Sequence, residues 1–317
     1  MYVKGLKFNL TNMFIDTKLG GMERCFLTKP KDYNMFIPNE IRDCVVFICD
    51  ENKIPRATGF LVSMQGNSPS LHFIYLVTAK HNVINIADKD FFIRINGKDG
   101  KIHYLRGNSS VQWIYHPEHA NNPADVAVIP FPFDENKFLS KTIPSEMFLK
   151  QKLIDDGTIG IGNNVFITGL FTHLSGKQRN MPIIRVGNIA MLPDEKVSTK
   201  MFGDIDSYLI EARSIGGVSG SPVFFVKPQE TKNGGVTLGA SIFYLGGLIH
   251  GHWDTLESRI DSYLPTEDVE VMRNINMGIA IVTPVNKILE TLNSNELIQN
   301  RVDVEKEIEK STLPTAD

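Results

Sequence analysis

Short apolar runs separated by turn residues dominate the chain from residue 41 onward. Each run is of strand length, is rich in β-branched and aromatic residues, and is bounded by Gly, Asn, Asp or Pro, which is the pattern of β-strands. The first set comprises residues 44–49, 58–62, 73–78, 91–95, 111–115 and 126–129. Six short strands so close together predict a β-sandwich or a β-barrel.

A second set of strands follows a more polar connection at about 134–157. It comprises residues 164–168, 183–190, 208–212, 222–226, 245–249 and 278–282. Closing a sheet into a barrel removes the exposed edges that invite aggregation, and two six-strand sets in tandem are what two barrels look like in sequence. The pattern therefore predicts an all-β fold with two tandem six-stranded antiparallel β-barrels.

The apolar spacing changes to a helical one near residue 284, where Val285, Ile288 and Leu292 recur three and four residues apart. Pro284 suits the first turn of a helix, and Thr283 is a candidate cap. We therefore divide the chain into an irregular N-terminal arm, two barrels and a C-terminal helix with a tail. The expected boundaries are 1–40, 41–145, 146–283 and 284–317.

Composition places the chain among globular proteins, with 317 residues that are 42% hydrophobic and 22% charged. The net charge of -3, without a basic stripe, argues against nucleic acid or an anionic membrane surface as a partner. The sequence contains no run of eighteen apolar residues that would span a membrane, and residues 1–21 lack the apolar core of a secretion signal. Cys25, Cys44 and Cys49 form no C-x-x-C pair, so we expect reduced thiols in a cytoplasmic protein.

Small residues surround one serine in the segment G-G-V-S-G-S-P at 216–222. A serine hydroxyl is a poor nucleophile unless a base lies beside it. Glycine permits unusual dihedral angles, so the backbone N–H groups of Gly217 and Ser219 are a candidate oxyanion hole. Because Gly and Ser also occur in ordinary strand connections, the segment by itself leaves that simpler interpretation open.

Two further residues have the chemistry that such a serine needs. His81 follows the strand 73–78, at a rim position where a general base is both held and exposed. Asp125 lies directly before the strand 126–129. An aspartate there is either a plain turn residue or the group that orients the histidine.

The segments G-x-S-G-S-P and T-A-x-H, and an aspartate before an apolar strand, resemble the motifs of chymotrypsin-like serine peptidases. The variants they resemble are the glutamyl endopeptidases and the high-temperature-requirement proteases. The order His81, Asp125, Ser219 is that of the family, and the resemblance covers about residues 41–293. It implies a serine endopeptidase with a polypeptide substrate and without a cofactor or metal. Asn82 stands where many secreted members have a cysteine, which agrees with a reducing compartment.

Two positions bear on control and substrate preference. Members activated by cleavage carry an aspartate before the nucleophile, and this chain has Val218, so we expect no such zymogen switch. Arg213 and Ser214 match family positions in the specificity pocket, and with His250 they would favour an acidic side chain before the cut bond. Arg213 facing solvent is the alternative. A one-residue slip in the glycine-rich stretch 246–254 would also move His250 to the other face of its strand.

Two other functions stay open at this stage. One is a catalytically silent protein of the same fold that binds a polypeptide segment. The other is a metal-dependent hydrolase at His250 and His252, for which the sequence offers no further ligands at suitable spacing. The polar stretch 254–277 is expected to be an inserted loop, which either docks a partner or regulator or is simply exposed.

Overall fold

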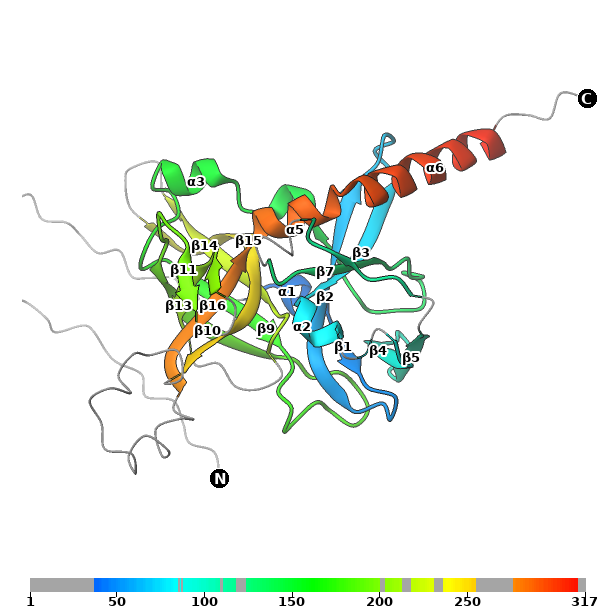
Figure 1. Ribbon diagram of the computed structural model, residues 1–317, viewed down its shortest axis with the longest axis horizontal. Helices are drawn as coiled ribbons and strands as arrows, with labels where there is room; N and C mark the ends of the chain where they lie inside the picture. Colours follow the sequence, from blue (N-terminus) through cyan, green and yellow to red (C-terminus); the bar gives the residue numbers. More distant parts are fainter. Residues whose placement is uncertain are drawn as a thin grey trace, which may run out of the picture. The chain divides into compact units, whose positions relative to one another are not determined.

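The computed structural model describes residues 37–84, 86, 88–108, 111–117, 124–199, 203–212, 218–230, 236–254 and 276–312. These residues belong to one compact unit, Met35–Asp317. Strands are its predominant secondary structure, and two helices follow the last strand (Figure 1). The expected N-terminal arm lies almost entirely outside the described residues.

The first strand set forms one eight-stranded sheet. Its main path runs in the order β5-β4-β1-β2-β3-β7-β6, with β8 paired to β2. The strands are β1 (Val45–Cys49), β2 (Pro55–Gln65), β3 (His72–Thr78), β4 (Phe91–Asn96), β5 (Ile102–Gly107), β6 (Ile114–Tyr115), β7 (Ala127–Pro130) and β8 (Ile143–Pro144). The sequence pattern missed β5, because it mixes polar with apolar residues and is half exposed. It also missed the two-residue β8.

The second strand set forms a closed antiparallel barrel in the order β10-β13-β16-β15-β14-β9. Its strands are β9 (Asn164–Gly169), β10 (Ile183–Met191), β13 (Tyr208–Glu211), β14 (Pro222–Glu230), β15 (Val236–Asp254) and β16 (Asn276–Pro284). All six contain a predicted strand. A separate hairpin, β11 (Val197–Thr199) with β12 (Gly203–Ile205), lies outside the barrel.

The all-β class, the second six-stranded barrel and the C-terminal helical region are thus confirmed, with one difference in the first set. Among the described residues that set is a sheet whose path ends at β5 and β6, whereas the second set is closed by hydrogen bonding. The expected boundary between residues 145 and 146 stays a prediction.

Strand β1 shows how the eight-stranded sheet and the closed barrel share an apolar core. Its side chains alternate between two apolar clusters, with Phe47 in one and Val46 and Ile48 in the other. The cluster that contains Phe47 also includes Phe166 of β9 and further barrel residues. Because successive side chains of a strand point to opposite faces, a strand buried on both faces needs the unbroken apolar run seen in the sequence.

Six helical segments of different lengths lie in the described part of the chain. They are α1 (Asn39–Asp43), α2 (Lys80–Val83), a 3-10 turn at Ser145–Met147, α3 (Gln151–Asp155), α5 (Val285–Leu292) and α6 (Asn295–Thr312). The predicted C-terminal helix is therefore divided in two. The predicted cap at Thr283 is wrong. Thr283 lies in β16, where it pairs with Leu248 of β15, and the helix begins after Pro284.

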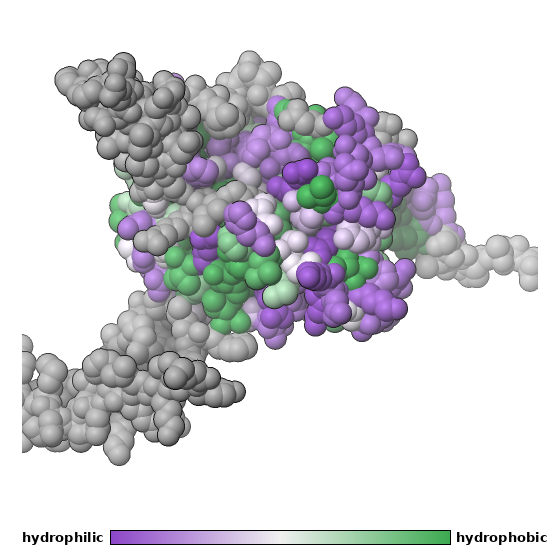
Figure 2. Space-filling model, turned by 90° about the horizontal axis from the view of Figure 1, so that it is seen from below, coloured by the Kyte–Doolittle hydropathy of each residue, from purple (hydrophilic) through white to green (hydrophobic). Residues whose placement is uncertain are grey.

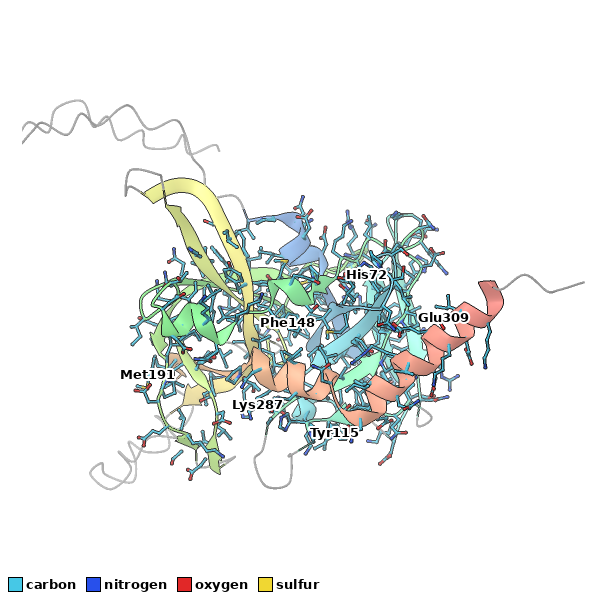
Figure 3. The ribbon with its side chains drawn as sticks, turned by 90° about the horizontal axis from the view of Figure 1, so that it is seen from above. His72, Tyr115, Phe148, Met191, Lys287 and Glu309 are labelled. Atoms are coloured by element: carbon cyan, nitrogen blue, oxygen red, sulfur yellow. The ribbon has the colours of Figure 1, made fainter. Side chains whose placement is uncertain are left out.

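The two C-terminal helices are attached at several points. Lys287 lies on α5 (Figure 3). Its amino group lies 3.1 Å from an Asp206 carboxylate oxygen. On α6, Arg301 donates to the Tyr75 hydroxyl at 3.0 Å, and Glu305 accepts from the backbone N–H of Asn67 at 2.8 Å. Helix α6 therefore connects the end of the barrel to the hairpin between β2 and β3.

The surface combines hydrophilic and hydrophobic regions, and the two described cysteines are buried. Figure 2 shows a face on which hydrophilic residues predominate on one side and a group of hydrophobic residues lies on the other. No helix in the described part is long and apolar enough to cross a membrane. Cys44 and Cys49 are free and buried, and burial raises the pKa of both thiols, that of Cys49 to about 12. Both thiols are therefore protonated at neutral pH.

Candidate active site

Ser219 lies in a tight turn immediately before β14. The Ser221 N–H donates to the Val218 carbonyl at 2.9 Å, and Gly220 in between has a φ of +80°. The turn is tied to β15, because the Gly220 N–H donates to the Ile249 carbonyl at 2.8 Å. Glycine is required at residue 220 because other residues rarely adopt a positive φ. This turn fixes the Ser219 hydroxyl at the edge of the barrel.

His81 lies in α2, the single helical turn that follows β3. Its Nε2 is 2.8 Å from Ser219 Oγ, and its Nδ1 is 2.6 Å from Asp125 Oδ2. The backbone N–H of His81 also donates to Asp125 Oδ1, at 2.9 Å. The structure therefore brings together the three residues proposed from sequence, with two contributed by the sheet and one by the barrel.

The Asp125 side chain is 7% exposed. Burial raises the pKa of its carboxyl, but the contacts and charges of His250 and His81 outweigh burial and hold the pKa well below its ordinary range. Asp125 is therefore an anion at neutral pH. An anion in contact with Nδ1 favours the tautomer with the proton on Nδ1, in which Nε2, the nitrogen that faces the serine hydroxyl, is a hydrogen-bond acceptor.

A group of polar residues holds the backbone carbonyl of Ser219. Asn82 Nδ2 donates to the Ser219 carbonyl at 3.0 Å and to Thr78 Oγ1 at 3.1 Å. The Thr58 N–H also donates to the Ser219 carbonyl, at 3.3 Å, and Thr78 Oγ1 donates to the Thr58 carbonyl at 2.7 Å. Sequence reasoning did not assign these roles. The available signal was Asn82 directly after the candidate base.

The imidazole of His250 is not placed as expected. We assigned it to a specificity pocket, but its side chain is 2% exposed and its Nδ1 lies 3.1 Å from Asp125 Oδ2. Its backbone carbonyl oxygen lies 3.0 Å from Ser219 Oγ. His250 is therefore close to both Asp125 and Ser219. The cause is a β-bulge, which shifts the β15–β16 register between Ile249 and Gly251.

Several predicted site residues lie outside the described residues. These are Arg213, Ser214 and Gly217, together with nearly all of the expected loop 254–277. The metal alternative requires His250 and His252 to converge, but His250 is buried and His252 is exposed. Within the described ranges, no three His, Cys, Asp or Glu residues are grouped so that they could hold a metal ion.

Comparisons with known proteins find similarity in fold. No protein-family model matches the sequence, and no curated protein matches it. The chain is similar to the protease domain of MamO from Magnetospirillum magneticum, at 14% identity and a TM-score of 0.47, covering 80% of this chain and 98% of that one. It is also similar to Deg5, at 11% identity and a TM-score of 0.44, covering 79% of this chain and 88% of that one.

A third similar structure is an inactive mutant form of Rv3671c from M. tuberculosis. Its identity is 14% and its TM-score 0.42, with 80% of this chain and 87% of that one covered. At such identities the similarity concerns the fold alone. In this chain a closed antiparallel barrel lies beside a second β-sheet, with the candidate histidine and aspartate next to the sheet and the candidate serine next to the barrel.

Proposed function

We propose that this chain is a serine endopeptidase. The observation that carries the proposal is the relay in which one imidazole contacts Asp125 at 2.6 Å and the Ser219 hydroxyl at 2.8 Å. Both distances are within the range that proton transfer to a general base requires.

The reaction would follow from these contacts. His81 Nε2 takes the hydroxyl proton as Ser219 Oγ bonds to the peptide carbonyl carbon, and the imidazolium is stabilised by Asp125. His81 then gives the proton to the leaving amine as the peptide C–N bond breaks, which leaves an acyl-enzyme. A water molecule, deprotonated by His81, hydrolyses the ester and restores the serine. The proposed oxyanion donors are the backbone N–H groups of Gly217 and Ser219.

Substrate preference is a finer part of the proposal. Arg213 and Ser214 remain our candidates for a pocket that accepts an acidic side chain before the cut bond. We no longer include His250, since its imidazole contacts Asp125. Cleavage of a peptide library, read by mass spectrometry, tests this preference in the wild type and in Arg213→Ala.

The experiment that tests the activity is labelling by a fluorophosphonate probe, which reacts with an activated serine. We expect one label per wild-type chain and none in Ser219→Ala. Ser221→Ala is the matched control, because this second serine of the same turn is fully buried. It is expected to retain labelling. A folded wild-type protein that takes no label and cuts no peptide in the library would overturn the proposal in favour of a silent binding protein.

A further inference from the structure

A cavity of about 640 Å³ is lined by the first sheet with its flanking segments and by the connection between β9 and β10. The chain contributes to its lining from α1 and the start of β1, from the end of β4, and from residues 139–140 and 177–182. None of His81, Asp125 and Ser219 lines it. Its volume is in the range of about 300–1,000 Å³ that is typical of ligand sites. The side chains of its lining indicate which ligand would fit.

The charged side chains of the lining are mainly basic. Arg42, Lys177 and Arg179 are exposed cations, and Asp43 is the one carboxylate among the lining residues. Asp43 pairs with Arg42 at 3.0 Å. Neither Lys177 nor Arg179 has an ion-pair partner among the residues that the structure describes. The chain as a whole has a net charge of -3, so this cavity has the opposite sign and favours an anionic ligand.

The segment that carries two of these cations is held in place by hydrogen bonds. Gly176, at its start, has a φ of +89°, and a Cβ there would overlap the Arg179 carbonyl, so the chain turns back closely on itself. At its end, the Asn180 N–H donates to Asn96 Oδ1 at 2.6 Å, and Asn180 Nδ2 donates to the Arg94 carbonyl at 2.6 Å. Because β4 fixes this backbone, a ligand would bind without ordering the wall of the cavity first.

The uncharged part of the lining suits a polypeptide. Asn180 is 6% exposed, and its Oδ1 has no hydrogen-bond partner among the described residues. A backbone N–H group of a bound polypeptide would supply the missing donor. Leu139 and the half-exposed Met181 add apolar surface. An acidic polypeptide offers carboxylates, N–H groups and apolar side chains together, whereas an inorganic anion offers the charge without the apolar contact.

We propose that this cavity binds an acidic segment of a polypeptide through Lys177 and Arg179. Binding of this kind does not depend on peptidase activity, so a catalytically silent chain would bind in the same way. Residues 1–36 carry six Lys or Arg and three Asp or Glu residues, so their net charge has the same sign as the cavity. The expected occupant is therefore a segment of another polypeptide.

Fluorescence anisotropy tests the proposal with a fluorescein-labelled peptide in which Glu alternates with Gly and Leu. The full chain carries Ser219→Ala so that the peptide stays intact, and the same peptide with Gln in place of Glu is the control ligand. We expect Lys177→Ala with Arg179→Ala to lower the affinity for the Glu peptide by about tenfold or more, because charge-assisted contacts are lost. Lys306→Ala with Lys310→Ala removes the same charge from exposed positions of α6, and we expect it to change the affinity by less than about twofold.

A second variant adds an anion to the cavity without removing a cation. Met181→Glu is expected to lower the affinity for the Glu peptide by about fivefold or more, because like charges repel. Val186→Glu is its control, since Val186 is 58% exposed and lies outside the lining. Circular dichroism confirms that each variant is folded.

Loss of affinity in both cavity variants but not in their controls, with no binding of the Gln peptide, supports the inference. It is overturned if the folded chain does not bind the Glu peptide, or if the cavity variants and their controls lose affinity equally. Displacement of the labelled peptide by inorganic phosphate as readily as by unlabelled Glu peptide also overturns it, because the cavity would then be a site for small anions. Fluorophosphonate labelling is a separate measurement, so failure of the peptidase proposal leaves this test intact.

Discussion

At the scale of single residues, Asp125 determines most of the site's electrostatics. It accepts from the His81 backbone and contacts two imidazoles, although its side chain is 7% exposed. These contacts hold the pKa of the carboxyl below its ordinary range, against the effect of burial. The charge that positions His81 therefore also stabilises the folded chain.

This stabilisation has a predictable dependence on pH. Because the pKa of Asp125 is lower in the folded than in the unfolded chain, the contribution is complete above the unfolded pKa of about 3.9 and is lost as the pH falls below it. We expect the difference in unfolding free energy between the wild type and Asp125→Asn to shrink between about pH 5 and pH 2.5. Urea unfolding at a series of pH values measures it, and a constant difference would contradict the prediction.

Gly220 is a second residue whose role is local and testable. Its φ is +80°, and a Cβ there would lie 2.4 Å from both the Thr58 carbonyl and Thr78 Oγ1. We expect Gly220→Ala to destabilise the fold by roughly 2–4 kcal/mol, from backbone strain and overpacking together. Gly100→Ala is the control, because Gly100 has a φ of +78° but nothing within 4 Å of the added atom.

Chemical unfolding of both glycine variants separates the two contributions. Gly100→Ala is expected to cost about 1 kcal/mol, which is the backbone term alone. Equal losses of unfolding free energy in the two variants would show that the close contacts of a Cβ at residue 220 do not add to the destabilisation.

At the scale of elements, α6 shows how one helix combines a buried and an exposed side. Leu297 is 1% exposed and belongs to the cluster that also includes barrel residues, while its neighbour Ile298 is 41% exposed. We expect Leu297→Ala to lower the free energy of unfolding by about 2–4 kcal/mol and Ile298→Ala by less than about 1 kcal/mol. Similar losses measured by urea unfolding would mean that α6 does not pack as described.

At the scale of the whole molecule, the connection between β9 and β10 joins the barrel to the first sheet. Arg94 of β4, which is 3% exposed, donates to the Ser175 carbonyl at 3.1 Å and to the Gly176 carbonyl at 2.5 Å. Asn180 Nδ2 donates back to the Arg94 carbonyl at 2.6 Å. These hydrogen bonds link the sheet, which carries the candidate base His81, to the barrel, which carries the candidate nucleophile Ser219.

Releasing this connection is expected to expose it to proteolysis. Lys177 and Arg179 are exposed tryptic sites within it. In a Ser219→Ala background, which removes self-cleavage, we expect Arg94→Leu to speed tryptic cutting there by about tenfold or more, because two charged hydrogen bonds are lost. Arg106→Leu is the control, since Arg106 is 64% exposed and pairs with Asp90. Equal cutting rates in the two variants would contradict the link.

The sequence by itself determined the strands of the closed barrel and the all-β class. It also singled out His81, Asp125 and Ser219, which the structure brings within hydrogen-bond distance of one another. A strand that is buried on both faces has an unbroken apolar run, which can be recognised in the sequence. The candidate catalytic residues stand next to such runs, at the ends of strands, and can therefore be recognised as well. The division of the C-terminal helix and strand β5 were missed, because their sequences carry weaker local patterns. Local patterns identify such elements only when spacing and composition agree.

Only the tertiary structure decided where His250 points and what holds the nucleophile turn. A bulge of one residue reverses the face of a side chain without changing the composition of the strand, so His250 moved from an expected pocket to the Asp125 carboxylate. The contact from Asn82 to the Ser219 carbonyl joins residues 137 positions apart. Pairings of that kind depend on how the sheet and the barrel meet, which no local stretch of sequence encodes.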